Sequence, residues 1–130
     1  MKQAVIATVA LLAGSAECWG SGNWVDGSHN RVKGSRNGIW GDGNGVRGNG
    51  NGVFGSGNQL GGNHNYVEGN WNSAWGNKNQ IVGNENRLEG NRNKVGGNWN
   101  QVGGNKNSVW GNSNSVWGNR NGVEGNGNGI

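Results

Sequence analysis

Residues 104–130 read GNKNSVWGNSNSVWGNRNGVEGNGNGI, which is one seven-residue motif repeated with small variations. The same motif, G-N-x-N-x-V-x, runs back to Gly20 without an inserted or lost residue, and its sixteenth copy ends at Ile130 one residue early. Position one is glycine and position four is asparagine in every copy, and position six is always aliphatic. Because unstructured low-complexity sequence drifts in register, this constancy indicates a stacked repeat structure.

A heptad period is also typical of coiled coils, but a helical seam needs two apolar positions per heptad and this repeat has one. A glycine in every repeat would also cost a helix roughly 1 kcal/mol each time. The Asn-Gly pairs, such as Asn37-Gly38, could mark hairpin turns. Other copies carry Asn-Gln, Asn-Tyr or Asn-Arg at the same place, so the asparagine is the fixed feature and short strands are favoured.

In an extended strand, positions two, four and six share one face, and positions three, five and seven share the other. The first set is nearly constant and the second set varies widely. We therefore expect positions two, four and six to pack inward and the variable positions to face solvent. The glycine at position one is expected at a tight corner that requires a positive φ.

Two heptads would form a flat, two-sided coil, and three would form a triangular coil. When alternate heptads are compared, the residues at position three fall into two sets: one is mostly basic and the other has no Lys or Arg. We predict an all-β fold, a two-sided β-solenoid or β-roll of about eight coils with two heptads each, over residues 19–130. The basic set, called the basic row below, consists of Arg36, His64, Lys78, Arg92, Lys106 and Arg120.

Burial of small aliphatic side chains does not by itself offset the entropy of ordering so long a chain. Backbone ladders between coils and asparagines stacked on their own copies must supply the rest. A buried asparagine has to be hydrogen-bonded, and a ladder satisfies it in every coil except those at the ends.

Residues 1–18, MKQAVIATVALLAGSAEC, have the layout of a secretory signal peptide: an early lysine, an apolar run and then small residues. Cleavage after Ala16 and after Cys18 both fit, and the apolar run is too short to span a bilayer. We therefore expect a secreted, extracellular protein. Its net charge of +4 is a mild bias that implies neither a specific nucleic-acid partner nor a membrane partner.

The motif N-x-V-x-G, present here as NWVDG, NRVKG, NGVRG and NSVWG, resembles the repeats of the grass ice-recrystallisation-inhibition proteins, a family of plant antifreeze proteins. The resemblance covers residues 20–130. It implies a two-sided β-roll with inward asparagine and valine, and ice binding through a flat row of outward side chains, many of them threonine or serine. The only threonine here is Thr8, and position five is not uniform.

Outward tryptophans are the first candidate binding residues, because exposed aromatic side chains commonly mark binding surfaces. Position seven carries Trp110 on one side of the predicted solenoid and Trp75 and Trp117 on the other, whereas Trp71 and Trp99 occupy position three. These rings could instead fold flat over neighbouring glycines. The basic residues Arg36, Lys78, Arg92, Lys106 and Arg120 would contact anionic groups, or serve only as a solvated surface.

We find no enzyme signature in the sequence. His29 and His64 stand alone in different rows, and no Cys or carboxylate cluster suits a metal. The GNGNG stretch is too repetitive for a phosphate loop and leads into no helix. We predict no catalytic residue, no metal and no cofactor.

Three functions follow, in order of preference. The first is a secreted, non-enzymatic β-solenoid that binds a cell-wall or matrix polysaccharide through the tryptophans and the basic row. The second is ice binding or inhibition of ice recrystallisation, which the resemblance implies. The third is a self-assembling extracellular fibre that associates at an open C-terminal edge.

Overall fold

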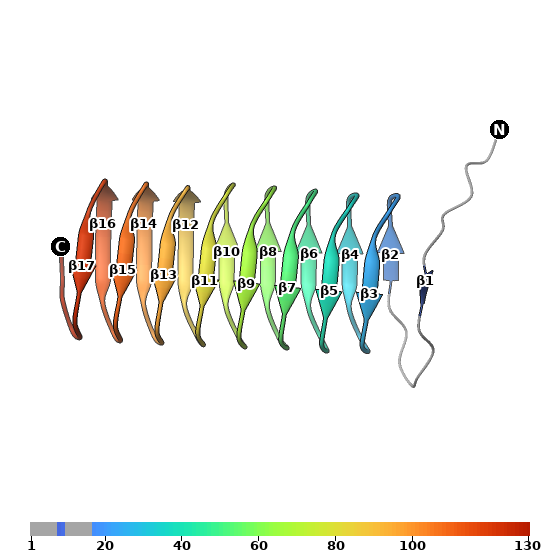
Figure 1. Ribbon diagram of the computed structural model, residues 1–130, viewed down its shortest axis with the longest axis horizontal. Helices are drawn as coiled ribbons and strands as arrows, with labels where there is room; N and C mark the ends of the chain where they lie inside the picture. The colour runs from blue at the N-terminus through green and yellow to red at the C-terminus, as the bar shows by residue number, and fades with distance from the viewer. Residues whose placement is uncertain (1–7, 10–16) are drawn as a thin grey trace.

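The computed structural model describes residues 8–9 and 17–130, and in them the chain forms a stack of short β-strands in two parallel sheets (Figure 1). These residues contain no helix long and apolar enough to cross a membrane. In the described chain, odd-numbered strands form sheet A and even-numbered strands form sheet B. Sheet A comprises β1 (Thr8–Val9), β3 (Trp24–Asp26), β5 (Gly38–Trp40), β7 (Gly52–Phe54), β9 (Tyr66–Glu68), β11 (Gln80–Val82), β13 (Lys94–Gly96), β15 (Ser108–Trp110) and β17 (Gly122–Glu124).

Sheet B lies behind sheet A in the view of Figure 1. Its strands follow one another in the order of the chain, each separated from the next by one strand of sheet A. It comprises β2 (Glu17–Trp19), β4 (Arg31–Lys33), β6 (Gly45–Arg47), β8 (Gln59–Gly61), β10 (Ser73–Trp75), β12 (Arg87–Asn91), β14 (Gln101–Asn105) and β16 (Ser115–Asn119).

In both sheets, paired residues of neighbouring strands are 14 positions apart in the chain, which is one coil of two heptads. Within β10, for example, Ala74 pairs with Leu60 on one side and with Leu88 on the other. Strands β2 to β17 therefore form eight such coils, and the predicted two-sided β-solenoid is confirmed. The chain passes from sheet B to sheet A along one edge of the solenoid and from sheet A to sheet B along the other; we call these the B-to-A edge and the A-to-B edge.

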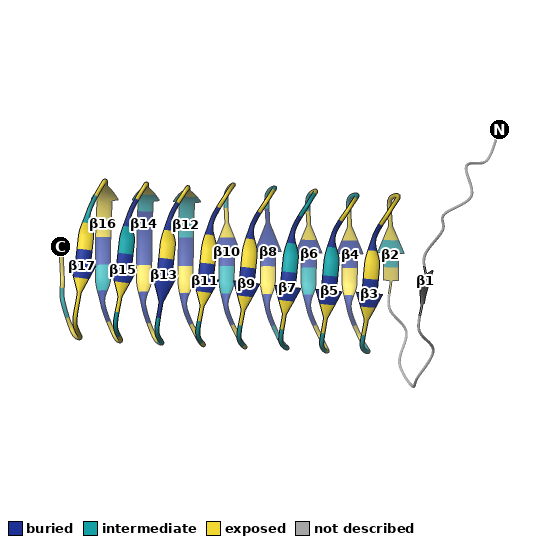
Figure 2. Cartoon of the chain, viewed as in Figure 1, coloured by how far each residue is buried: buried dark blue, intermediate teal, exposed yellow. Residues whose placement is uncertain are grey.

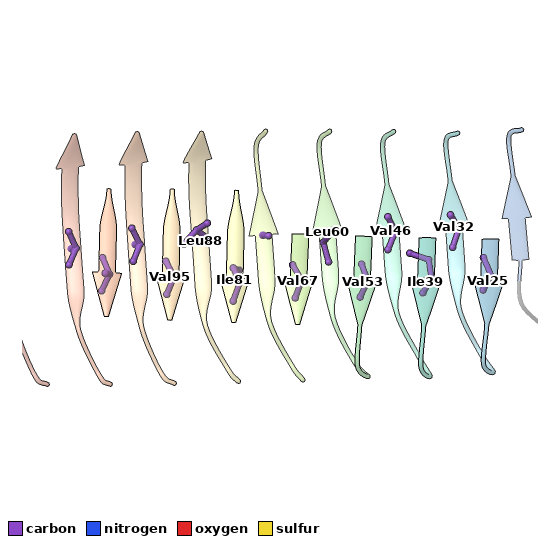
Figure 3. Packing of buried hydrophobic residues seen from close by; sticks show 14 of the residues in the cluster. Val25, Val32, Ile39, Val46, Val53, Leu60, Val67, Ile81, Leu88 and Val95 are labelled. Carbon is purple, nitrogen blue, oxygen red and sulfur yellow. The ribbon is translucent and has the colours of Figure 1, made fainter. Parts of the chain in front are cut away.

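The core lies between the two sheets and contains the position-six aliphatic residues from Val25 to Val123, whereas the last one, Ile130, is exposed. Each strand from β3 to β17 buries its position-six residue, as the dark bands in Figure 2 show, and β8, β13 and β14 also bury the glycine that follows it. Side chains from both sheets point into this space, including Val25, Ile39 and Val53 from sheet A and Val32, Val46 and Leu60 from sheet B (Figure 3). The inward placement of position six is thereby confirmed.

Position four also points inward, and its asparagines form two ladders along the solenoid axis. The side-chain oxygen Oδ1 of Asn58 accepts hydrogen bonds from the backbone N–H of Asn72 (2.9 Å) and from its Nδ2 (3.2 Å). The Nδ2 of Asn72 also donates to the carbonyl of Gly83 (2.8 Å). Among the described residues, every buried side-chain nitrogen and oxygen has a hydrogen-bond partner. The asparagine ladder therefore lets a polar side chain occupy the core without an unsatisfied group.

The expectation that position two packs inward is wrong. These residues lie in the turns and are exposed or half-buried, because the extended segment spans only positions five to seven in most copies. They form outer ladders instead: the backbone N–H of Asn70 donates to Oδ1 of Asn84, and the N–H of Ser56 donates to Oδ1 of Asn70, each at 2.9 Å. Strict alternation fails where the strand ends.

Positions one and three both have positive φ. Gly76, at position one, has φ +120°, and a Cβ there would overlap the carbonyl of Gly90 in the next coil, so only glycine fits. Position three is left-handed in every copy, with φ between 56° and 70°, although eleven of the sixteen residues are not glycine. The sequence carried a signal for this conformation, since position three is never Val, Ile or Thr, the residues least tolerant of positive φ.

Strand β2 extends the repeat beyond the predicted start of the array. Cys18 pairs with Val32, is half-buried and packs against the core, so Glu17, Cys18 and Trp19 take positions five, six and seven. Burial raises the pKa of the Cys18 thiol. Cleavage after Ala16 would keep this strand intact, whereas cleavage after Cys18 would divide it. Residues 1–7 and 10–16 of the predicted signal peptide lie outside the described residues.

We expect replacement of asparagine by alanine to lower the free energy of unfolding more in the inner ladder than in the outer ladder. Asn72→Ala removes the partners of the buried Asn86 backbone N–H and of the part-buried Gly83 carbonyl. We expect the free energy of unfolding to fall by about 2 kcal/mol or more. Asn70→Ala, in the same turn, removes hydrogen bonds that water can replace and should cost less than about 1 kcal/mol. Chemical denaturation measures both, and equal losses would contradict a structural role for the inner ladder.

Candidate binding surfaces

Trp75 is fixed on the outside of sheet B by two neighbours. Its indole ring lies over Gly61, the residue one coil earlier in the chain, where a Cβ would overlap ring atoms Cε3 and Cζ3. Its Nε1–H donates a hydrogen bond of 2.9 Å to Oγ of Ser73 in the same strand. A glycine below the ring and a serine on its polar atom therefore set the orientation of the ring.

The same arrangement recurs twice. Trp110 lies over Gly96 and donates to Ser108 at 3.0 Å, and Trp117 lies over Gly103 and donates to Ser115 at 3.1 Å. We call Trp75, Trp110 and Trp117 the anchored tryptophans. They are 47%, 50% and 56% exposed, respectively. Each ring lies over the glycine one coil earlier, as the alternative expects, and still leaves about half of its surface exposed for binding.

Trp71 and Trp99 stand in turns of the A-to-B edge, in the left-handed conformation common to position three. Both are largely exposed, and the ring of Trp71 lies over Gly57 in the preceding coil. These turns lead into β10 and β14, so four of the five predicted tryptophans lie on sheet B or on the edge that enters it. Trp110 lies on the opposite face, in sheet A.

The basic row lies along the B-to-A edge, on the other side of the solenoid from Trp71 and Trp99. Lys78, Arg92 and Lys106 line an open groove of about 350 Å³ together with the outer-ladder residues Asn77, Asn91 and Asn105. Arg120 follows on the next coil, because its backbone N–H donates to the carbonyl of Asn105. Gly50 and His64 separate Arg36 from this group. The structure thus keeps the basic row and the tryptophans of sheet B apart.

A cluster of aromatic side chains on sheet A was missing from the predicted site residues. The rings of Trp40 and Phe54 stack with centroids 4.6 Å apart and planes 1° apart, and Tyr66 lies 5.7 Å from Phe54 at 48°. The Tyr66 hydroxyl donates to Oε2 of Glu68 at 3.1 Å. Burial, this hydrogen bond and the charge of Glu68 raise the pKa of Tyr66. The signal was the spacing of two heptads between Trp40 and Phe54, both at position seven.

Within residues 17–130, no three His, Cys, Asp or Glu side chains come close enough together to hold a metal ion. Two ion pairs form in this part of the chain, Arg31–Glu17 and Arg87–Glu89, and both are solvent-exposed. The absence of an enzyme activity stays a prediction.

The contact of Ser73 with the Trp75 indole predicts a local change on mutation. Ser73→Ala removes the hydrogen bond at Nε1, and the exchange of that proton with water should become up to about fivefold faster, as expected for a bond worth about 1 kcal/mol. NMR of the indole N–H signals measures this rate. The Trp117 signal, held by Ser115 on the same face, is the internal control, and an unchanged Trp75 rate would contradict the anchoring.

We compared the chain with protein-family models, curated proteins and solved structures, and none of the three comparisons gave a match. The resemblance to the grass antifreeze repeats therefore stays a prediction, and the function has to be argued from the surfaces themselves.

Proposed function

We propose that this protein is a non-enzymatic β-solenoid that binds an extended polysaccharide along sheet B by stacking sugar rings on tryptophans. The observation that carries the proposal is the anchoring of Trp75 and Trp117, each with a glycine beneath the ring and a serine on its N–H. The signal-peptide pattern of residues 1–18 supports an extracellular site of action.

Anchoring favours binding because it lowers the entropic cost of association. A free tryptophan side chain loses rotamer freedom when a ligand covers it, whereas Trp75 and Trp117 are already held in one orientation. Their N–H groups already donate to a serine hydroxyl, so a ligand that covers the ring leaves no polar group without a hydrogen-bond partner. Such a face presents apolar area and suits the C–H-rich face of a sugar ring.

Sheet B is better suited to this role than sheet A. On sheet A, Trp40 and Phe54 stack on each other, so each ring covers part of the other's surface. On sheet B, the open faces of Trp75 and Trp117 have no aromatic neighbour among the described residues. Trp71 and Trp99 add two exposed rings at the edge that leads into this sheet.

The spacing of the rings favours a polymer over a small ligand. Trp75 and Trp117 lie three coils apart in sheet B, which corresponds to roughly 14 Å at the usual strand spacing. Trp71 and Trp99 lie two coils apart, roughly 10 Å. A small molecule could contact one ring, whereas an extended chain running along the solenoid axis could contact several at once and gain from multivalency.

Ice binding, which the resemblance implies, is the second candidate. The regular spacing of coils supports it, because a rigid solenoid repeats its surface at a constant interval. The outward rows of both sheets in residues 17–130, however, mix glycine, charged and aromatic side chains and contain no uniform row of hydroxyl groups. Glycan binding therefore has the stronger support.

Binding to insoluble polysaccharides tests the proposed function. We expect Trp75→Ala and Trp117→Ala each to weaken binding about five- to tenfold in a depletion assay against cellulose, xylan and chitin, because each removes one stacking surface. The matched control is Trp110→Ala, which deletes an identically anchored ring from sheet A and should leave binding unchanged. Circular dichroism confirms that the variants stay folded.

Two results would contradict the proposal. Absence of binding to every glycan of the panel would remove it, and an ice-recrystallisation assay run in parallel would show whether ice is the ligand instead. Equal loss of binding in Trp75→Ala and Trp110→Ala would show that sheet B is not the specific binding face.

A further inference from the structure

Sheet B carries an open hollow near its N-terminal end that none of the predicted site residues except Trp75 touches. Its volume is about 710 Å³. The floor is formed in part by Gly45, above which a Cβ would meet nothing within 4 Å, and by the backbone around Val46 and Leu60. The walls are tall side chains of neighbouring coils: Trp19, Arg31, Lys33, Arg47 and Trp75.

The walls of this hollow carry excess positive charge. Lys33 and Arg47 occupy position seven of adjacent strands and are directly paired in register, so their side chains start about 4.8 Å apart. Within residues 17–130, neither lies within ion-pair distance of a carboxylate, whereas Arg31 contacts Glu17 at 3.2 Å. Two like charges this close repel each other, and a bound anion would relieve that repulsion.

The hollow continues the row of anchored tryptophans. Position seven of sheet B reads Trp19, Lys33, Arg47, Gly61, Trp75, Glu89, Gly103 and Trp117 in successive coils. A chain laid along the axis from Trp117 past Trp75 would next reach the guanidinium of Arg47 and the ammonium of Lys33. Stacking surfaces and cations are thus arranged along one line on one face.

Resting on the proposed function, we infer that its ligand is an acidic polysaccharide, and that the hollow bounded by Trp75, Arg47 and Lys33 binds a sugar ring that carries a carboxylate. The ring of such a residue would stack beside Trp75 while its carboxylate accepts hydrogen bonds from Arg47 and Lys33, a charge-assisted contact. The open volume over Gly45 leaves room for the sugar.

The charges at position seven of sheet B favour a ligand with scattered carboxylates over a dense polyanion. A nucleic acid presents a phosphate at every residue and requires many cations along its path. The row of sheet B offers two adjacent cations, then Trp75, and then the carboxylate of Glu89. That carboxylate is ion-paired with Arg87, and position seven of sheet B offers no further cation beyond Arg47 in residues 17–130. A polyphosphate backbone would therefore leave most of its charges without a partner along this row, whereas a glycan can place an uncharged face there.

Two polymers that share one sugar backbone test this inference: polygalacturonate, which is charged, and its methyl ester, which is neutral. We expect the native protein to bind the acid form about tenfold more tightly at low ionic strength, with a smaller difference at about 1 M salt. The double variant Lys33→Gln/Arg47→Gln should lose the preference and still bind the ester as the native protein does. The control Lys78→Gln/Lys106→Gln removes two charges from the basic row and should keep the preference.

The outcomes separate this inference from the proposed function. Equal binding of the acid and ester forms by the native protein would overturn the acidic subsite and leave glycan binding in place. Binding to neither form, together with no binding to the neutral glycan panel, would remove both. Loss of the preference only in Lys78→Gln/Lys106→Gln would overturn the hollow as the site and assign the anion contact to the basic row.

Discussion

The hydrogen bonds between asparagines of successive coils impose the constraint on which the rest of this structure depends. From Asn23 to Asn114, each inner asparagine accepts from the coil after it and donates to a glycine carbonyl 11 residues ahead, so every coil must have the same length as its neighbours. The glycine at position one adds a second constraint, since from Gly20 to Gly111 a Cβ there would overlap the carbonyl of the glycine one coil later. A chain built in this way tolerates no inserted residue, and the sequence contains none from Gly20 to Ile130.

This fixed interior leaves the outward positions free to vary. The ladders are formed by side chains at positions two and four, so substitutions at positions five and seven leave them in place. A tryptophan at position seven lies over a glycine at position seven of the preceding coil of the same sheet. The glycine leaves room for the indole ring and helps to set its orientation, as Gly61 does for Trp75. Binding surfaces of this kind lie on the outside of the sheets, and the proposed glycan and acidic subsites both lie on the outside of sheet B.

The coil of two heptads, the inward asparagines and the aliphatic core were predictable from the sequence because each recurs at a fixed position. The direction of position two was mispredicted because alternation holds only within an extended strand, and the strand covers only positions five to seven in most copies. The left-handed backbone at position three could have been inferred from the absence of Val, Ile and Thr there. The anchoring of Trp75 could not be inferred from the local sequence, since Gly61 lies a full coil earlier in the chain and becomes its neighbour only through the register. The signal peptide, the extracellular location, ice binding and self-association stay predictions.

The thermal unfolding midpoint of two insertion variants tests the central claim most directly. One variant carries a single glycine inserted into the turn at residues 76–78, and the other carries a duplicate of residues 69–82, which is one complete coil. In-register stacking predicts that the single residue lowers the midpoint strongly, because it shifts every later asparagine out of its ladder. The added coil should keep or raise the midpoint, since it extends both ladders. A single-residue insertion that leaves the midpoint unchanged would contradict the account.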